Sequence, residues 1–374
     1  MTINSTDADG TGSIPPVLGT PDPVKTDYPF LFTGTGGEYF RIWIVNIALT
    51  LVTLGFYSPW AKVRNNRYIY GNTSVAEGFF DYHADPWVIL RGRIIALVLL
   101  LIYLLGQNFF PVLIPILFVL LIIATPWIVV RSLAFNARNT SWRNIRFNFI
   151  GKPMGAAGAY LGWPLFGLVT LGFGMPFAWF KAAAFGANNH RLGQTHFNMT
   201  ARPVDFYAIA MWLILASFVA ALAAGLVGAA GILGAAGGLE GLENADSEDP
   251  ISGAALAAQI PLFIIMALIY LTIFNLFGAL RFKTIYDKLD LGKNRIHNSM
   301  SISGFLVIAV TNSLGMLFTL GLFYPWAKVR MTRFMVESLN LEAADLDNFV
   351  AAAESEQSAI GEELGEAFDL GIGV

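Results

Sequence analysis

The sequence has 374 residues, of which 55% are hydrophobic and only 13% are charged. Soluble domains carry about a quarter charged residues, so this composition indicates a membrane protein. There is no cysteine, which excludes disulfides, thiolate metal sites and a cysteine nucleophile. The net charge of −3 is unremarkable, and we expect no nucleic-acid partner.

The two ends of the chain are polar. Residues 1–27 contain four prolines and no apolar stretch after a basic one, so we expect a disordered tail and no signal peptide. Residues 341–374 form an acidic tail, which either stays solvated or folds back on a basic surface. The membrane domain is therefore expected at 28–340.

Seven hydrophobic segments follow one another along this domain: 39–60, 94–105, 109–130, 155–180, 206–236, 256–280 and 303–326. A helix needs about 20 apolar residues to cross a bilayer. We expect two transmembrane hairpins, at 94–130 and 206–280. The small residues Ala221, Gly225 and Ala229 in the second hairpin allow close helix contact, within the chain or with a second copy in a homo-oligomer.

The chain contains internal repeats. Residues 30–82 align with 147–199 without a gap, and both copies contain the run LVTLGF. A third copy around 304–340 repeats the PWAKVR of 59–64, and 126–149 is a partial copy. We place the repeat units at about 28–85, 126–202 and 281–340. Their helix-breaking and interface-anchoring residues are Gly55, Pro59, Trp60, Gly172, Pro176, Gly321, Pro325 and Trp326.

Each of these prolines is expected to end or kink a helix, because it lacks an N–H donor and clashes with the preceding turn. The tryptophan that follows in two copies is expected at the level of the lipid headgroups. Beyond the helices, the partial copy continues into RFNFIG, whose period-two alternation predicts a short strand.

The basic residues suggest how the segments lie in the membrane. Of the 23 Lys and Arg, 21 fall in five segments between the hydrophobic stretches, whereas the connection 237–253 is acidic. Basic segments favour the cytoplasm. Because 155–180 and 303–326 are basic at both ends, we favour repeat segments that enter and leave the membrane on one face. Seven plain spans are the alternative. Both termini are expected in the cytoplasm.

These observations predict an all-α polytopic membrane protein, in which Gly/Pro-broken repeat segments alternate with two transmembrane helical hairpins. Short cytoplasmic β elements would complete the fold.

Two kinds of candidate site residue follow. Cations after the helix breaks would contact lipid headgroups or other anions, unless they only anchor the topology: Lys62, Arg64, Arg67, Lys328, Arg330 and Arg333. The polar residues expected at membrane depth are Asn46, Asn275 and Asn312, for which hydrogen bonds between helices are the simplest role.

The sequence offers little for catalysis. It has no G-x-S-x-G, H-E-x-x-H or P-loop motif, and its four histidines lack the partners of a zinc site. We therefore expect that the protein is not an enzyme and that it binds no metal and no cofactor.

The stretches TLGFYSPWAKVRNNRYIYGNTS at 53–74 and PWIVVRSLAFNARNTSWRNIRF at 126–147 resemble the YjgN family of bacterial inner-membrane proteins. The resemblance covers about 28–340. It implies a multi-pass inner-membrane protein of unknown function and supplies no catalytic residue. Two hypotheses remain open: a permease or channel-like protein for a small solute or lipid, and a non-transporting scaffold that binds anionic lipid or a protein partner.

Overall fold

The computed structural model describes residues 25–109, 113–235, 253–344, 346 and 350–351. The strands in this part of the chain are β1 Thr26–Phe32, β2 Thr73–Val75, β3 Gly78–Tyr82, β4 Thr140–Trp142, β5 Ile145–Phe149, β6 His190–Leu192, β7 Thr195–Met199, β8 Leu289–Leu291, β9 Asn294–Asn298 and β10 Leu339–Ala343. The helices are α1 Gly36–Val52, α2 Ser58–Gly71, α3 Pro86–Phe109, α4 Leu113–Arg138, α5 Pro153–Ala157, the short π-helix η1 Gly158–Gly162, α6 Trp163–Val169, α7 Met175–Asn188, α8 Pro203–Ala235, α10 Gly253–Tyr286, α11 Ile302–Phe318 and α12 Tyr324–Glu337.

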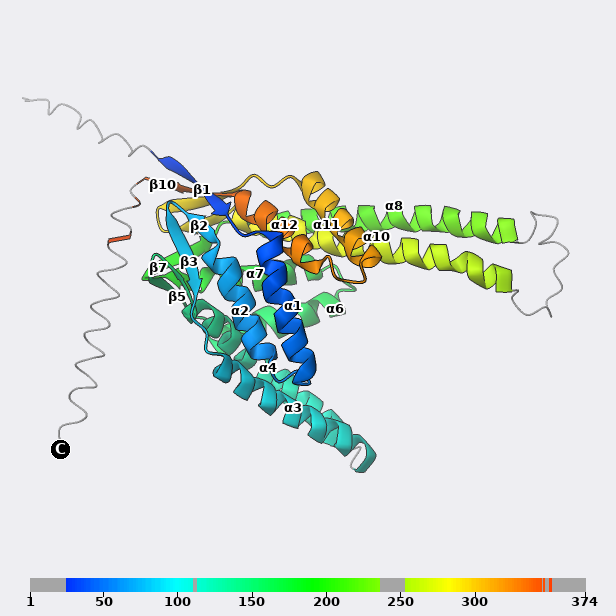
Figure 1. Cartoon of the computed structure of the whole chain (residues 1–374), viewed down its shortest axis with the longest axis horizontal. Helices are drawn as coiled ribbons and strands as arrows, with labels where there is room; N and C mark the ends of the chain where they lie inside the picture. The colour runs from blue at the N-terminus through cyan, green and yellow to red at the C-terminus, as the bar shows by residue number, and fades with distance from the viewer. Residues whose placement is uncertain (1–24, 110–112, 236–252, 345, 347–349, 352–374) are drawn as a thin grey trace, which may run out of the picture.

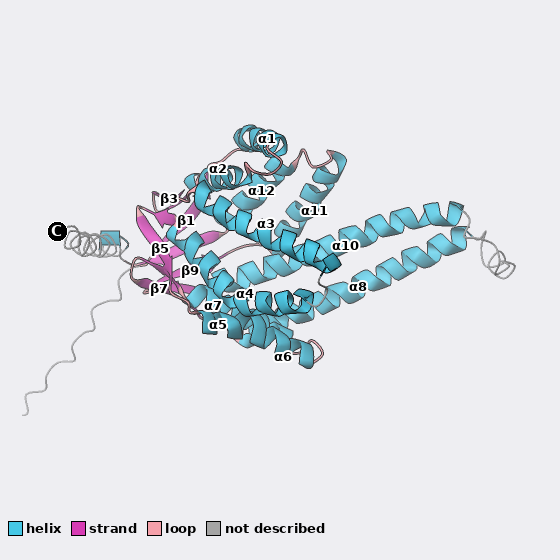
Figure 2. Cartoon of the chain, turned by 90° about the horizontal axis from the view of Figure 1, so that it is seen from below, coloured by secondary structure: helices cyan, strands magenta, loops and turns pink. Residues whose placement is uncertain are grey.

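The strands form a closed antiparallel barrel, so the prediction of an all-α fold was wrong. Every strand pairs with its neighbours in chain order, and β10 pairs with β1 to close the ring. Figures 1 and 2 show the strands gathered at one end of the molecule, with the helices extending from them. The strands have three to seven residues, too few to cross a bilayer as a barrel, which takes about 9–11.

The same order of elements, strand, helical hairpin, strand, occurs five times in the described chain. We number these units 1 to 5; they begin at β1, β3, β5, β7 and β9. The expected hairpins 94–130 and 206–280 belong to units 2 and 4, so they are built like the repeat segments. Parts of the expected tails, 26–27 and 341–343, lie in β1 and β10, while 1–24 and 352–374 lie outside the described residues.

One backbone hydrogen bond marks the base of every unit. The N–H just after the first strand donates to the carbonyl just before the second strand. The five pairs are Thr33 to Asn72 (3.0 Å), His83 to Asn139 (2.8 Å), Ile150 to Asn189 (2.9 Å), Thr200 to Lys288 (2.9 Å) and Ser299 to Ser338 (2.9 Å). Both ends of each helical hairpin therefore lie at the barrel, and consecutive units are joined by two-residue β-turns.

The repeated Thr-Leu-Gly motif makes the tip of the hairpins in units 1, 3 and 5. In unit 1, Gly55 N–H donates to Thr50 O at 2.7 Å and Leu54 N–H donates to Leu51 O at 3.1 Å, which is the Schellman pattern. Leu54 and Gly55 have φ of +50° and +91°. Equivalent bonds and angles occur at 171–172 and 320–321. The helix breaks predicted at Gly55, Gly172 and Gly321 therefore coincide with the three turns.

Proline has the opposite role from the one expected. Pro59, Pro176 and Pro325 lie at the second residue of α2, α7 and α12, so they begin the returning helix rather than end the outgoing one. Proline fits the first turn of a helix, where its missing N–H has no partner to lose. The preceding threonine caps this turn, because the Thr53 hydroxyl accepts from Tyr57 N–H at 2.9 Å.

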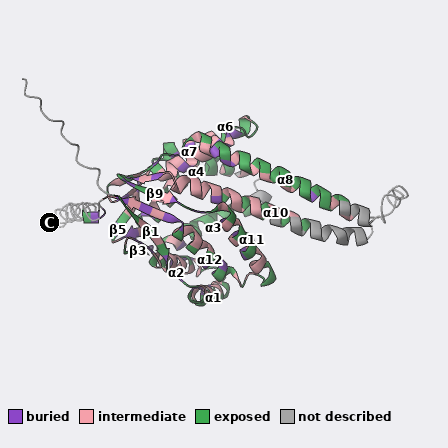
Figure 3. Cartoon of the chain, turned by 90° about the horizontal axis from the view of Figure 1, so that it is seen from above, coloured by how far each residue is buried: buried purple, intermediate pink, exposed green. Residues whose placement is uncertain are grey.

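Three helices in the described residues are long and apolar enough to cross a membrane: α3, α4 and α8. Figure 3 shows that α8 is exposed over most of its described length. Adjacent hairpins also touch around the ring, since α2 contacts α3, α4 contacts α5, α7 contacts α8, α10 contacts α11, and α12 contacts α1.

Candidate functional site

The interior of the barrel holds a cavity of about 600 Å³. Its first ring of side chains comes from the middle of β1, β3, β5, β7 and β9: Phe30, Phe80, Phe147, Phe197 and Ile296. The four phenylalanines stack in sequence, with ring centroids 6.2–6.3 Å apart. Side chains alternate along a strand, so each of these five strands places its residue of this ring toward the cavity, a phenylalanine in units 1 to 4 and an isoleucine in unit 5.

A second ring lies directly opposite the first across the strand pairs. Its members are Val75, Trp142, Leu192, Leu291 and Leu341. Trp142 is held in place because its indole N–H donates to Val75 O at 3.3 Å and Gly78 O at 3.2 Å. These two rings make the barrel end of the cavity almost entirely apolar.

At its helical end the cavity is lined by side chains whose size differs between the units. Two residues before the carbonyl at each unit base, the helices carry Tyr70, Ala137, Ala187, Tyr286 and Val336. The two alanines belong to α4 and α7. Beyond them the cavity continues between α4, α7, η1 and α10, lined by Leu133, Ala183, Gly186, Tyr160 and Arg281. The site is therefore a barrel cavity that extends into the helices.

Two side chains in the cavity wall can carry a positive charge, Arg281 and His190. Arg281 on α10 carries a permanent positive charge, and no Asp or Glu lines the cavity in the part of the chain described. His190 on β6 is half-buried. Burial lowers the pKa of His190, although its hydrogen bond with Gly186 O, 2.6 Å from Nδ1, acts in the opposite direction. His190 is therefore neutral at pH 7.

The predicted lipid-binding cations divide into two groups. Arg67 Nε donates to Tyr82 O at 3.2 Å and Arg333 donates to Gly34 O at 2.7 Å, in each case a carbonyl of the next unit. Arg330 donates to Thr311 Oγ1 at 2.9 Å. The remaining three, Lys62, Arg64 and Lys328, are exposed.

Lys283 makes the same bond as Arg67 and Arg333, although the sequence did not single it out. Its Nζ donates to Met300 O of unit 5 at 2.7 Å. All three residues lie five positions before the carbonyl at their unit base. We call Arg67, Lys283 and Arg333 the inter-unit cations, because each ties its helix to the end of the next unit's first strand.

The predicted polar residues at membrane depth make hydrogen bonds between or within helices. Asn46 Nδ2 on α1 donates to Asn65 Oδ1 on α2 at 2.9 Å, and Asn312 Nδ2 on α11 donates to Ala327 O on α12 at 3.1 Å. Asn275 Nδ2 donates to Leu271 O of its own helix at 2.7 Å.

The two predicted interface tryptophans pack between neighbouring units. Trp60 contacts Trp87 of α3 edge to face, with ring centroids 5.0 Å apart. Trp326 stacks on Phe40 of α1, also at 5.0 Å. Their aromatic surface therefore joins adjacent hairpins, whatever they also contribute at a membrane surface.

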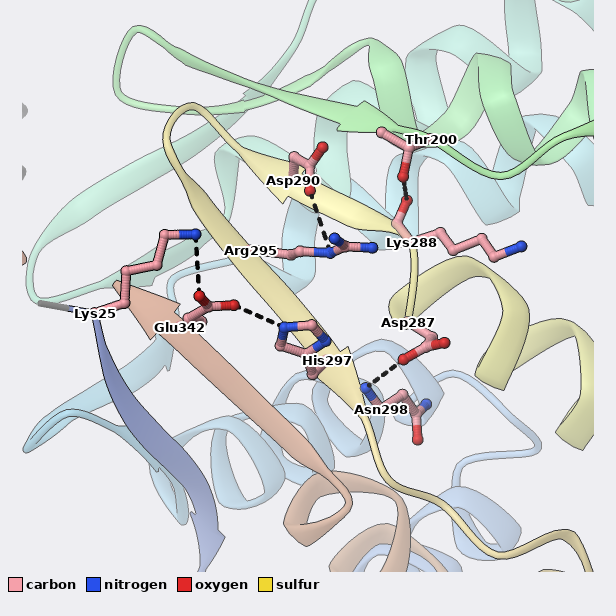
Figure 4. Close-up of polar contacts among 9 residues, drawn as sticks. All are labelled: Lys25, Thr200, Asp287, Lys288, Asp290, Arg295, His297, Asn298 and Glu342. Atoms are coloured by element: carbon pink, nitrogen blue, oxygen red, sulfur yellow. Dashed lines mark hydrogen bonds and ion pairs between the residues drawn. The ribbon is translucent and has the colours of Figure 1, made fainter. Parts of the chain in front are cut away.

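A polar cluster covers the outside of the barrel near its closing strands (Figure 4). Lys25 and His297 both contact Glu342, at 3.0 and 2.8 Å, and Arg295 lies 3.8 Å from Asp290. The His297 hydrogen bond, followed by the Lys25 contact, lowers the pKa of Glu342. This cluster links β10 to β9 and to the residue preceding β1.

Comparisons with known proteins agree with the sequence resemblance. Residues 27–367 match the family described as bacterial protein of unknown function (DUF898). The inner membrane protein YjgN of Salmonella typhimurium is 36% identical over 124 residues, which is 33% of this chain and 31% of the relative. YjgN of Escherichia coli K12 is 31% identical over 132 residues, again 33% and 31%.

The matched region thus spans about a third of these curated relatives, and no solved structure matches. The relatives' names and the apolar helices together support a location in the bacterial inner membrane. The chain belongs to the DUF898 family of bacterial proteins of unknown function, to which the resemblance to YjgN pointed.

Proposed function

We propose that this protein takes a small apolar molecule or lipid from the bacterial inner membrane into its barrel cavity, as a permease-like protein. The observation that carries the proposal is the cavity of about 600 Å³, which runs from an aromatic barrel interior into the space between α4, α7 and α10. This volume lies in the range of ligand-binding pockets, and its apolar walls suit a ligand that prefers lipid to water.

In this proposal the helical hairpins enter the lipid and the barrel lies at the cytoplasmic surface. Every hairpin begins and ends at the barrel, where the basic segments also lie, and basic segments favour the cytoplasm. The hairpins of units 1, 3 and 5 would dip into the membrane and return. Their tip residues Leu54, Leu171 and Leu320 are 90–97% exposed, a cost in water that lipid removes.

Single cysteines in this cysteine-free chain test the topology. We choose Gly37, Met154 and Ser299, which lie near the barrel, and the three tip leucines. A membrane-impermeant maleimide should label the first three from the cytoplasmic side alone and should label the tips from neither side. Labelling of 37 and 154 from opposite sides of the membrane would contradict the proposal.

A cavity-filling substitution tests ligand binding. A Cβ at Gly186 meets no atom within 4 Å, and Gly186 lines the cavity, so Gly186→Phe should place its ring inside. We expect it to reduce binding of Nile red, a neutral hydrophobic dye, at least several-fold. Gly278→Phe is the matched control, because Gly278 also has open space but does not line the cavity. Equal binding by both variants would exclude the cavity as the site.

A second candidate function is a scaffold that binds anionic lipid through its surface cations. Lys62, Arg64 and Lys328 are exposed and form no hydrogen bond or ion pair with other described residues, so they are free to contact headgroups. Replacing all three with Gln should lower the amount of phosphatidylglycerol that copurifies with the protein. An unchanged amount would remove this candidate.

A further inference from the structure

We infer that the ligand of the barrel cavity is a single-chain amphiphile with one carboxylate, whose acidic group pairs with Arg281. The inference rests on the proposed function and adds the chemical class of the ligand. It begins from one charged, half-buried side chain in the cavity wall, Arg281.

Among the described residues, Arg281 has no partner for its charge. Its guanidinium forms no hydrogen bond or ion pair with the described residues, and the other residues that line the cavity are mostly apolar. A charge against apolar walls is costly unless it is paired. A guanidinium binds a carboxylate through two parallel hydrogen bonds, which makes a carboxylate the natural partner.

The fold does not require a cation at this position. Arg281 lies seven residues before the carbonyl at its unit base, and the other four units carry Asn65, Ser132, Ala182 and Met331 at the equivalent place. The other basic residues near the end of α10 do have partners, since Lys283 binds Met300 O and Lys288 lies 2.7 Å from Asp205. Arg281 is therefore available for a ligand.

The position of Arg281 sets the orientation of the ligand. Arg281 lies five residues before Tyr286, the last residue of α10, which corresponds to roughly 7.5 Å along the helix. The acidic group would lie among the helices, where Tyr160 is within electrostatic range of Arg281, and the apolar chain would extend into the aromatic rings. One permanent cation matches one negative charge, so a monocarboxylate fits better than a phosphate ester with two.

The barrel contains a reporter for this ligand. Trp142 lies in the second ring, so a terminally brominated dodecanoate bound in this orientation should quench its fluorescence. The experiment uses the full chain in a non-ionic detergent and compares this acid with the brominated alcohol of equal length. The variants are Arg281→Gln, Arg281→Lys, Trp142→Phe and, as a surface control, Arg64→Gln, each first checked for an unchanged circular dichroism spectrum.

We expect the acid to bind the wild-type protein at least tenfold more tightly than the alcohol, and Arg281→Gln to abolish the difference without weakening the alcohol. Arg281→Lys should keep part of the preference for the acid over the alcohol, and Arg64→Gln should keep all of it. Trp142→Phe should remove most of the fluorescence quenching. Equal affinities of the wild-type protein for acid and alcohol would overturn the inference and leave the proposed function standing. If neither probe quenches and Gly186→Phe has no effect on Nile red, the proposed function itself fails.

Discussion

At the scale of single residues, basic side chains that follow similar sequence patterns have different contacts in the structure. Arg67, Lys283 and Arg333 donate to backbone carbonyls of the next unit, whereas Arg281 lines the cavity without a hydrogen bond or ion pair to any residue that the structure describes. A basic cluster can be read from the sequence, but its partners cannot, because the carbonyl bound by Arg333 belongs to Gly34, at the other end of the chain.

Removing one inter-unit cation should destabilise the fold. Arg333→Gln loses a charged hydrogen bond of 2.7 Å to Gly34 O, so we expect the free energy of unfolding to fall by about 1.5–3 kcal/mol. Lys328→Gln on the same helix is the control and should change it by less than about 0.5 kcal/mol. Denaturant unfolding in detergent, followed by tryptophan fluorescence, measures both. Equal effects would show that the Gly34 contact contributes nothing.

The half-buried His190 should make the stability of the fold depend on pH. Its pKa is lowered by folding, so the unfolded chain binds the proton more tightly, and stability falls as the pH drops below about 6.5. We expect the loss of thermal stability between pH 7.5 and 5 to be smaller in His190→Leu than in the wild-type protein. Leucine is a suitable replacement, because Leu289 and Leu339 occupy the equivalent place in units 4 and 5.

The exposed His196 supplies the control for this prediction. His196→Leu also removes one histidine, from strand β7, which pairs with β6. This variant should keep the pH dependence of stability of the wild-type protein. A His190→Leu variant with the full wild-type dependence would mean that other groups dominate the acid response.

At the scale of elements, the Thr-Leu-Gly turn explains why three units have short hairpins. The threonine hydroxyl caps the returning helix, and the leucine and glycine take positive φ at the turn. The sequence predicts these breaks well, since the glycine requirement is local. The sequence led to the wrong role for proline. Whether a proline ends one helix or begins the next depends on where the chain has already turned.

Alanine at the turn glycine should cost stability. Gly321 has φ +90°, which an alanine reaches only with strain, so Gly321→Ala should lower the free energy of unfolding by about 1–2 kcal/mol. Gly278→Ala lies in the middle of a helix and should be neutral or stabilising by up to about 1 kcal/mol. Thermal unfolding of the two variants tests this contrast. A Gly321→Ala variant as stable as the wild type would show that the turn relaxes without cost.

At the scale of the whole molecule, the barrel is closed by strands from opposite ends of the described chain. β1 pairs with β10, and the outer face beside this seam carries the cluster of Lys25, His297 and Glu342 (Figure 4). Because the units form a ring, opening the seam leaves two edge strands exposed, and such edges favour aggregation.

The junction between β1 and β10, which we call the seam, should contribute less to stability in acid, because protonation of Glu342 weakens its ion pairs. Its folded pKa is lowered, so its contribution is complete above the ordinary glutamate pKa and disappears as the pH falls through the lowered value. Glu342→Gln should therefore reduce the unfolding temperature at pH 7 and make little difference at pH 3. Glu77→Gln is the control, because Glu77 is exposed in the turn between β2 and β3, away from the pairing of β1 with β10. An equal loss in the two variants at pH 7 would argue against a role for the seam.

The sequence by itself determined the membrane class, the hydrophobic segments, the three glycine turns and the family, because each depends on composition or on residues close together in the chain. It also indicated a period-two strand in RFNFIG, which is β5 in the structure. Only the tertiary structure decided that these strands close into a barrel, that units 2 and 4 share the architecture, and that Arg281 lines the cavity. The reason is physical: each strand has five residues or fewer in most units, so it has no preference strong enough to act alone, and its neighbour is often separated from it by a whole helical hairpin.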